Sequence, residues 1–294
     1  MGYVNCNLCG ADDYTVVFRK GEAQLHQIVR CRQCSLMYAN PQEEVDVVTL
    51  MTDESVPQVY IPEEHAEYFH KQQVQLPDNL RALAVLNSLL PQRGRLLEVG
   101  SYCGFFLNRI RQDGWDAVGL EPFRAGADYA RTRFGLNIID GALPQPGLPD
   151  GSFDAIVMLH VIEHMPDPLA NLRELRRLLR PGGILVVETP RFDSLSFKVL
   201  GKRERSVAAC NGHIYFFTVP TLRSMMQKSG FDVARTDLVG RTLTLQRLLT
   251  NVGIVSKSDR VLQTLRGVSQ TMHLDRVQMH VNVRDMQRMY CRAV

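Results

Sequence analysis

Five short apolar runs recur from residue 95 onwards, with helical segments between most of them. The runs are RLLEVG, DAVGLE, LNIID, FDAIVML and GILVVET. Runs this rich in apolar and β-branched residues are typical of parallel strands buried on both faces, because crossover helices then cover the sheet. The sequence therefore predicts an α/β fold built on an open parallel sheet.

Helical segments flank these runs. Residues 63–76 and 79–90 read as two helices, and the second carries a leucine stripe at 80, 83, 86 and 90. A further helix is expected to begin after Asp167 as N-cap with Pro168 in its first turn, and to end before Gly182 and Gly183.

Four of the seven cysteines form two C-x-x-C pairs near the N-terminus, Cys6 with Cys9 and Cys31 with Cys34. Paired knuckles of this kind hold one tetrahedral zinc ion, and in a reducing compartment metal explains them better than disulfides. A redox role needs only one such pair, at the start of a helix. Four thiolates leave no open coordination position, so the predicted zinc is structural. The other cysteines, at 103, 210 and 291, are expected to be small buried apolar residues.

Composition places few limits on the function. The chain has 294 residues, 45% of them apolar, and 34 basic against 31 acidic side chains give a net charge of +3. This charge is too small to indicate a nucleic-acid partner by itself. The opening residues lack the pattern of a secretion signal, and no long uncharged apolar stretch is present, so no membrane is expected and the cytoplasm is the predicted location.

The expected domain organisation has three parts. Residues 1–40 form a zinc-binding module, 41–78 a linker and helix, and 79–294 the α/β domain. Residues 240–275 read as helices inserted before the last strand. Their apolar side can complete a substrate pocket or the interface of a homodimer, and the sequence leaves both open. The apolar residues are Leu243, Leu245, Leu248, Leu249, Val261, Leu262 and Leu265.

The stretch LLEVGSYCGFFL marks the expected ligand crevice at the carboxyl end of the first strand of the α/β domain. Dinucleotide binding would require glycines where Tyr102 and Phe105 stand, so that fingerprint fails. S-adenosylmethionine has no pyrophosphate, and one close approach near Gly100 is sufficient for it. Glu98 can then serve the ligand's amino group, and Glu121, at the end of the second strand, can take both ribose hydroxyls.

Several motifs together resemble class I S-adenosylmethionine-dependent methyltransferases of the branch that includes ubiquinone-type and sugar methyltransferases. They are LLEVGSYCGFFL, VGLEP, LPDGSFDAIVMLHVIEHMPDP, LRRLLRPGGILVVETP and HIYFFTVPTLRSMMQKSGF, and RCRQCSLMYANP resembles the zinc-binding head of sugar C-methyltransferases. The resemblance implies a Rossmann-like seven-stranded sheet with a reversed final strand, FDVARTDLV being the sixth strand and VNVRDMQRMYCRA the seventh. A small zinc-ribbon-like module would precede it.

The resemblance also implies roles for individual residues. Glu98, Gly100, Ser101 and Gly104 match the loop at the methionine end of the cofactor, and Tyr102 replaces that loop's usual middle glycine. Glu121 matches the ribose acid. Gly141 and Ala142 match the backbone beside adenine, although an ordinary turn explains them as well, and His160 matches the lining of the methionine end.

His213 is the candidate base that removes the acceptor's proton. It lies in the segment that arches over the crevice in this family. In sugar C-methyltransferases a histidine that follows a glutamate serves as base, but Gly212 occupies the glutamate position here. His213 can also simply cap the aromatic cluster Tyr215, Phe216 and Phe217. For His164 a contact at a helix entry is favoured over catalysis.

The sequence therefore predicts an S-adenosylmethionine-dependent methyltransferase that acts on a small molecule such as a sugar, a nucleotide-linked sugar or a secondary metabolite. The alternative is a ribosomal RNA base methyltransferase whose zinc module binds RNA, with RELRRLLR and GKRERS as basic patches. A third hypothesis is a zinc-ribbon adaptor without catalytic activity, which the presence of Glu98 and Glu121 argues against.

Overall fold

The structure is a computed structural model that describes residues 2–22, 26–42, 62–204, 207, 212–249, 259–272, 274 and 276–294. Its centre is a seven-stranded sheet in the order β10-β11-β8-β7-β4-β5-β6. The strands are β4 (Arg95–Val99), β5 (Asp116–Glu121), β6 (Asn137–Asp140), β7 (Phe153–Leu159), β8 (Leu179–Pro190), β10 (Phe231–Thr244) and β11 (Gln278–Ala293).

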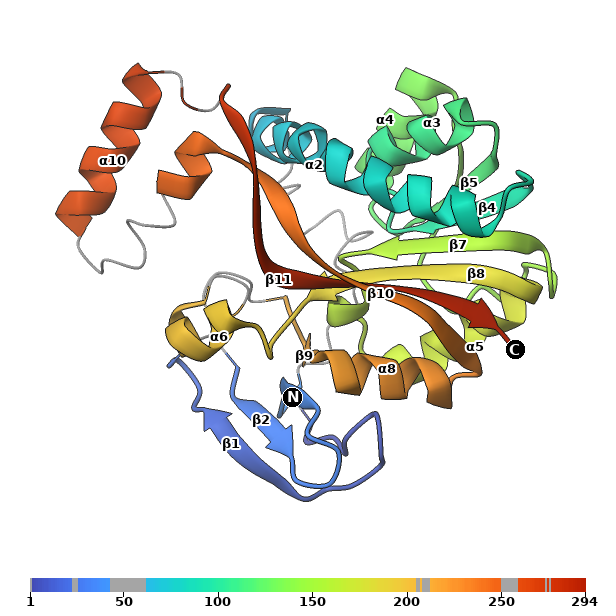
Figure 1. The fold of residues 1–294 in the computed structure, drawn as a ribbon, viewed down its shortest axis with the longest axis horizontal. Coiled ribbons are helices and arrows are strands. Elements are labelled where there is room, and N and C mark those ends of the chain that lie inside the picture. Colours follow the sequence, from blue (N-terminus) through green and yellow to red (C-terminus); the bar gives the residue numbers. More distant parts are fainter. Residues whose placement is uncertain are drawn as a thin grey trace.

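Helices cover both faces of this sheet (Figure 1). One face carries α2 (Pro62–Leu89), α3 (Phe105–Gln112) and α4 (Arg124–Phe134), and the other carries α5 (Pro168–Leu178) and α8 (Val219–Lys228). Shorter helices are η1 (Ile162–His164), α6 (Leu195–Leu200) and η2 (Gly201–Arg203), and α10 (Asp259–Thr271) projects away from the sheet (Figure 1). The predicted α/β fold class is confirmed.

The final strand runs opposite to its neighbours, as the resemblance implied. β4, β5, β6, β7 and β8 are parallel, whereas β11 lies between β8 and β10 and is antiparallel to both. β10 contains the predicted sixth strand and β11 the predicted seventh. β10 continues to Thr244, so the first residues of the segment predicted as a helical insertion are strand, and Leu243 is buried there. Residues 250–258 and the side chains of Val261 and Leu262 lie outside the described part.

The helix before the sheet differs from the prediction. The two helices expected at 63–76 and 79–90 are one helix, α2, which continues through Pro77 and across the expected boundary at residue 78. The side chain of Asp78 accepts hydrogen bonds from Thr242 N at 2.5 Å and Thr242 Oγ1 at 3.1 Å on β10. These tertiary contacts hold the helix where proline alone predicts a break. The rest of the expected linker, 43–61, lies outside the described residues.

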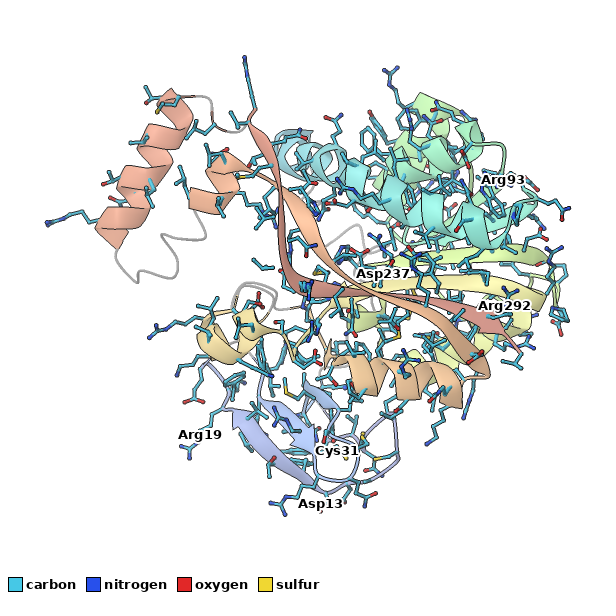
Figure 2. The ribbon with its side chains drawn as sticks, viewed as in Figure 1. Asp13, Arg19, Cys31, Arg93, Asp237 and Arg292 are labelled. Atoms are coloured by element: carbon cyan, nitrogen blue, oxygen red, sulfur yellow. The ribbon has the colours of Figure 1, made fainter. Side chains whose placement is uncertain are left out.

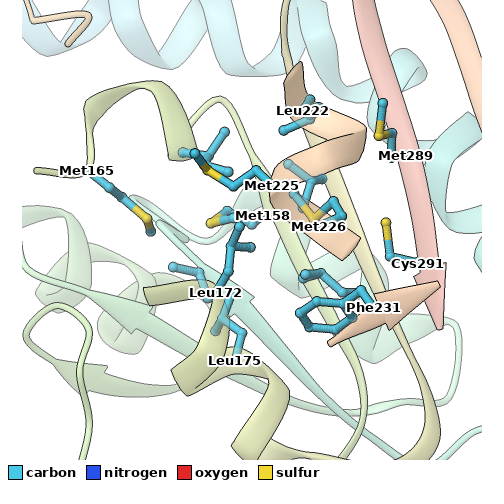
Figure 3. Close-up of a cluster of buried hydrophobic side chains, with 14 of the residues drawn as sticks. Met158, Met165, Leu172, Leu175, Leu222, Met225, Met226, Phe231, Met289 and Cys291 are labelled. Atoms are coloured by element: carbon cyan, nitrogen blue, oxygen red, sulfur yellow. The ribbon is translucent and has the colours of Figure 1, made fainter. Parts of the chain in front are cut away.

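Helix α5 begins as expected, because Asp167 Oδ1 accepts a hydrogen bond from Ala170 N at 2.9 Å. Its end differs: the backbone becomes extended at Leu179, and Gly182 and Gly183 lie inside β8. The core beneath the sheet is closed by α5 and α8, whose buried faces meet strand residues such as Met158 and Met289 (Figure 3).

The N-terminal residues form a small second sheet in the order β1-β2-β3-β9. Its first strands are β1 (Tyr14–Phe18), β2 (Ile28–Cys31) and β3 (Met37–Ala39), which belong to what we call the head, residues 2–42. The fourth strand, β9 (Tyr215–Phe216), comes from the α/β domain and pairs antiparallel with β3. The sheet of the head is therefore completed by a strand that lies far along the chain, between β8 and β10.

Candidate active site

The predicted cofactor residues gather at the carboxyl edge of the sheet, where β4, β5, β6 and β7 end. Gly100 N donates to Leu120 O at 2.8 Å, and Gly141 N donates to Glu121 O at 3.1 Å. These bonds join the turns that follow β4 and β6 to the end of β5. The turn residues predicted from separate motifs thus form one continuous edge.

Glu121 links two of the turns. Its Oε2 accepts a hydrogen bond from Tyr102 N at 2.6 Å, and its Oε1 accepts one from Phe123 N at 2.9 Å. The side chain is buried, and burial raises its pKa to about 7 although the two backbone donors oppose the shift. Glu121 therefore shapes the loop and lies at the position expected for the ribose acid.

Glu98 is buried in β4, two residues before the turn. Burial raises its pKa well above the usual range, and the neighbouring charge of Glu121 raises it further. Glu98 Oε2 and the hydroxyl of the adjacent buried Ser101 have no hydrogen-bond partner among the described residues. Buried polar atoms are almost always paired in native proteins, so these two indicate a polar ligand.

The glycines of the edge have no room for a side chain. A Cβ on Gly100 would meet Val161 Cγ2 at 2.6 Å, and one on Gly104 would meet Leu136 Cδ1 at 2.5 Å. Both glycines have a positive φ, and so does Tyr102 at 45° in the place of the usual middle glycine. The ring of Tyr102 stacks on Phe123 with centroids 5.5 Å apart. The loop shape is thus kept by an aromatic residue at a strained position.

Gly141 and Ala142 follow β6 at the same edge. Gly141 has φ of 124°, and a Cβ there would meet Gln145 Nε2 at 2.9 Å. Ala142 O accepts a hydrogen bond from Gln145 Nε2 at 2.8 Å. Both residues are partly exposed in a turn. The geometry fits the predicted adenine flank and an ordinary turn equally, and the adenine role stays a prediction.

His160 lies at the end of β7 with φ of 59°. Its Nε2 is 3.3 Å from Glu188 Oε1, and its Nδ1 is 3.8 Å from Glu163 Oε1. Burial lowers the pKa of His160, but the two carboxylates outweigh burial and raise it to about 9. The guanidinium of Arg288 donates to Glu188 Oε2 at 2.5 Å and balances its charge.

His213 lies beside two residues of the β7 loop. Its ring centroid is 4.7 Å from that of His164, and one potential ligand atom each from Glu163, His164 and His213 lie within 4.8 Å of one another. Glu163 and His213 are buried, and His164 is exposed. Burial favours the neutral form of Glu163, yet the three nearby histidines lower its pKa to about 2. We call Glu163, His164 and His213 the acceptor cluster.

Two charged residues that lie beside His160 were not predicted from the sequence. Glu188 and Arg288 were not predicted as site residues, and Glu163 was noted only as the neighbour of His164. The signal for Glu188 was a lone carboxylate at the end of the apolar run GILVVET. Arg288 had no comparable signal, because its strand returns from the far end of the chain to reach Glu188.

The predicted zinc ligands Cys6, Cys9, Cys31 and Cys34 come together in the head, with all four Sγ atoms within 4.8 Å of one another. Cys6 and Cys34 sulfurs are 3.3 Å apart, and Cys9 and Cys31 sulfurs 3.5 Å. Zn–S bonds of about 2.3 Å in a tetrahedron place sulfurs about 3.8 Å apart, so the cluster fits zinc. Cys103 and Cys291 are buried as predicted, and Cys210 lies outside the described residues.

The described helices include none that is long and apolar enough to cross a membrane.

Comparison with known proteins identifies the family. Residues 68–236 match the model of a methyltransferase domain. A tRNA U34 carboxymethyltransferase of Syntrophotalea carbinolica is 34% identical over 166 residues, which are 53% of this chain and 51% of that protein. A ubiquinone biosynthesis O-methyltransferase of Cereibacter sphaeroides is 33% identical over 118 residues, 38% of this chain and 48% of that protein. The chain thus spans about half the length of these curated relatives.

A solved structure shows the same fold. The crystal structure of a SAM-dependent methyltransferase from Thermotoga maritima superposes with a TM-score of 0.54 at 20% sequence identity, and the match covers 79% of this chain and 96% of that one. The match of the domain model to more than half of the sequence confirms the resemblance stated above. The chain belongs to the methyltransferase-domain family.

Proposed function

We propose that this protein transfers the methyl group of S-adenosylmethionine to a small-molecule acceptor, such as a sugar, a nucleotide-linked sugar or a secondary metabolite. The observation that carries the proposal is the carboxyl edge of the sheet. There, Glu98, Ser101 and Glu121 surround glycine turns that leave no room for side chains.

These residues suit the cofactor's separate parts. Glu98 Oε2 and Ser101 Oγ are buried polar atoms available for the amino and carboxylate groups of the methionine moiety. Glu121 offers a carboxylate to the ribose hydroxyls, and Gly141 with Ala142 offer backbone to adenine. When bound, S-adenosylmethionine supplies an electrophilic methyl carbon. The protein's part is to hold an acceptor in line with it and to manage the acceptor's proton.

We assign the chemistry at the acceptor to the acceptor cluster. His213, the predicted base, is buried beside Glu163 and His164, and its neighbour Ile214 N donates to Glu163 O at 2.8 Å. The segment that contains His213 is thereby tied to the loop after β7. That loop also touches the carboxyl edge of the sheet with its glycine turns, which we call the cofactor edge, since Val161 packs against Gly100. Cofactor and acceptor are thus expected to meet across residues 160–164.

The head has a structural task in this proposal. Asn7 contacts the start of α5, because its Nδ2 donates to Asp167 Oδ1 at 2.8 Å. Lys228 Nζ at the end of α8 donates to Leu8 O at 2.6 Å. Zinc bound by the four cysteines would fix the turn between Cys6 and Cys9, which contains Asn7 and Leu8. It would also hold β3 in position to pair with β9. We propose that zinc is structural here and that the head helps to shape the acceptor side.

An RNA acceptor is the second candidate, because relatives named tRNA U34 carboxymethyltransferase match half of the chain. The charges of the first predicted basic patch, on α5, and of the head argue against it, and the second patch, GKRERS, lies partly outside the described residues. On α5, Arg177 pairs with Glu174 at 2.7 Å and with Asp150. In the head, Asp13 lies on the outer side together with Arg19, and pairs with Arg32 at 3.4 Å (Figure 2). Arginines already paired with carboxylates contribute little to phosphate binding.

Radiolabelled S-adenosylmethionine distinguishes the two candidates. The protein is incubated with the labelled cofactor and an extract that is then split into small-molecule, RNA and protein fractions. Label is expected in the small-molecule fraction and, at limiting cofactor, strongly reduced when a Glu121→Ala variant replaces the wild type. Label in RNA would replace the small-molecule proposal with the RNA one, and absence of label from every fraction would count against methyl transfer.

A further inference from the structure

We propose that Glu163, His164 and His213 form a metal site separate from the cysteine cluster, which holds a divalent first-row transition-metal ion and takes a hydroxyl oxygen of the acceptor at an open position. This inference rests on the proposed function and names its acceptor class as a hydroxyl-bearing molecule. It begins with a cluster of two imidazoles and one carboxylate within 4.8 Å of one another.

The donor set suits such an ion. Two histidines and one carboxylate bind zinc, iron or cobalt and leave coordination positions open for water or substrate. Ligand atoms about 2.1 Å from an ion lie roughly 3 to 4.2 Å apart. Separations of at most 4.8 Å therefore require only small side-chain adjustments to bring all three atoms onto one ion.

Hydrogen bonds already orient two of the proposed ligands. His164 Nδ1 lies 2.8 Å from Gly212 O, a distance at which this nitrogen donates to the carbonyl and the other ring nitrogen is left for a metal. Glu163 Oε2 accepts a hydrogen bond from the buried Thr189 Oγ1 at 3.0 Å. Metal-binding histidines and carboxylates are usually held by outer partners of this kind.

The remaining carboxylate oxygen supplies the independent evidence. Glu163 is 1% exposed, and its Oε1 has no hydrogen-bond partner among the described residues. Its Oε1 forms a long ion pair with His160 Nδ1 at 3.8 Å, a distance beyond that of a direct hydrogen bond. A buried carboxylate oxygen that accepts no hydrogen bond is costly, and a cation bound directly to it would lower that cost. An ion shared with His164 and His213 meets that need.

The position of the cluster gives the ion a function. His164 is exposed, so a ligand can approach from its side, and Val161 of the same loop packs on Gly100 at the cofactor edge. An ion there lowers the pKa of an acceptor hydroxyl that binds to it. The hydroxyl proton leaves to water, the oxygen forms a bond to the methyl carbon, and the carbon–sulfur bond breaks to release S-adenosylhomocysteine. His213 then acts through the ion and does not itself take the proton.

Cobalt(II) is the probe that tests this site, because sulfur-bound cobalt has an intense charge-transfer absorption that nitrogen- and oxygen-bound cobalt lacks. The 294-residue protein, with its cysteine cluster first loaded with zinc, is dialysed against citrate to strip weakly held ions and then titrated with cobalt(II). The expected result is one further equivalent bound, with visible absorption and no sulfur charge-transfer band. Neither cofactor nor acceptor is needed, so this result stands apart from the radiolabel test.

Variants locate the ion. His164→Ala removes an exposed ligand and is expected to weaken cobalt binding at least tenfold, as is Glu163→Gln if its circular dichroism shows that it folds. His280→Gln, an exposed imidazole on β11, serves as the matched control and should bind cobalt as the wild type does. Absence of the further equivalent from the wild type, or binding that is unchanged in His164→Ala, would overturn the proposal.

Discussion

Tyr38 of the head lies directly opposite Tyr215 of the α/β domain in the β3–β9 pair, and their rings stack with centroids 6.3 Å apart. Ala39 N also donates to Ile214 O at 2.8 Å. These contacts fix the residues immediately after His213, so the head and the acceptor cluster share one short segment of backbone.

This relationship predicts that loss of the zinc proposed for the head's four cysteines separates catalysis from cofactor binding. In a Cys34→Ser variant, or after removal of zinc by a strong chelator, methyl transfer should fall at least about tenfold because β9 loses its partner strand. Affinity for S-adenosylmethionine, measured by calorimetry, should change less than about threefold. Parallel losses of both quantities would show that the head supports the whole domain and not the acceptor side.

Substitutions of Tyr102 can measure the backbone strain in the turn after β4. The residue has φ of 45°, where glycine is unstrained and other residues are not. Tyr102→Gly and Tyr102→Ala both lose the stacking on Phe123, but only the alanine variant keeps the strain. The glycine variant should therefore be more stable by about 1 kcal/mol in urea unfolding. Equal stability of the two variants would contradict a strained loop.

The raised pKa of Glu121 predicts a pH dependence of stability. Its pKa is about 7 in the folded protein against an ordinary value of 4.5, so the folded state binds this proton more tightly than the unfolded chain does. The free energy of unfolding should consequently fall as the pH rises through this interval, by up to about 3 kcal/mol.

A Glu121→Gln variant removes that titration, and its stability should be flatter than that of the wild type between about pH 5 and 7. Asp116→Asn, at the exposed start of the same strand, is the control and should leave the wild-type slope in place. The comparison uses urea unfolding at several pH values without cofactor. Identical slopes in Glu121→Gln and the wild type would show that Glu121 is not the titrating group.

Arg288 is expected to be essential for stability. It is buried on β11 and pairs with the buried Glu188 at 2.5 Å. An Arg288→Met variant would leave that buried carboxylate with His160 as its remaining charged partner and should lose about 3 kcal/mol. Arg292, an exposed residue further along the same strand (Figure 2), offers the control Arg292→Met, which should cost less than about 1 kcal/mol. A loss as small for Arg288→Met would contradict the importance of the pair.

Sequence patterns predicted the sheet because buried parallel strands are encoded locally, as in FDAIVML, and their carboxyl ends meet by topology alone. They also predicted that four cysteines come together, because two C-x-x-C pairs are typical of a single zinc site. They failed where distant contacts decide: Asp78 reaches β10 and carries α2 through Pro77. Likewise, nothing local to β9 indicates that it completes the sheet of the head.

The acceptor cluster also combines a residue that could be predicted from local sequence with one that depends on distant contacts. His213 was predicted from its place in the chain, whereas its relation to Glu163 depends on folding that joins two separate loops. The missing glutamate beside His213 left the sequence without a carboxylate at this site. Glu163 supplies one from the β7 loop, at a distance in sequence that no local motif spans.

The most direct test of the account is calorimetric titration of S-adenosylmethionine into the wild type, Glu121→Ala and Asp116→Ala. Glu121 ends β5 at the proposed cofactor edge, and Asp116 begins the same strand at the opposite edge. Binding should weaken by about 2 kcal/mol, or roughly thirtyfold, in Glu121→Ala through the loss of two charged hydrogen bonds, and stay unchanged in Asp116→Ala. Wild-type affinity in Glu121→Ala, or no binding by the wild type, would contradict it.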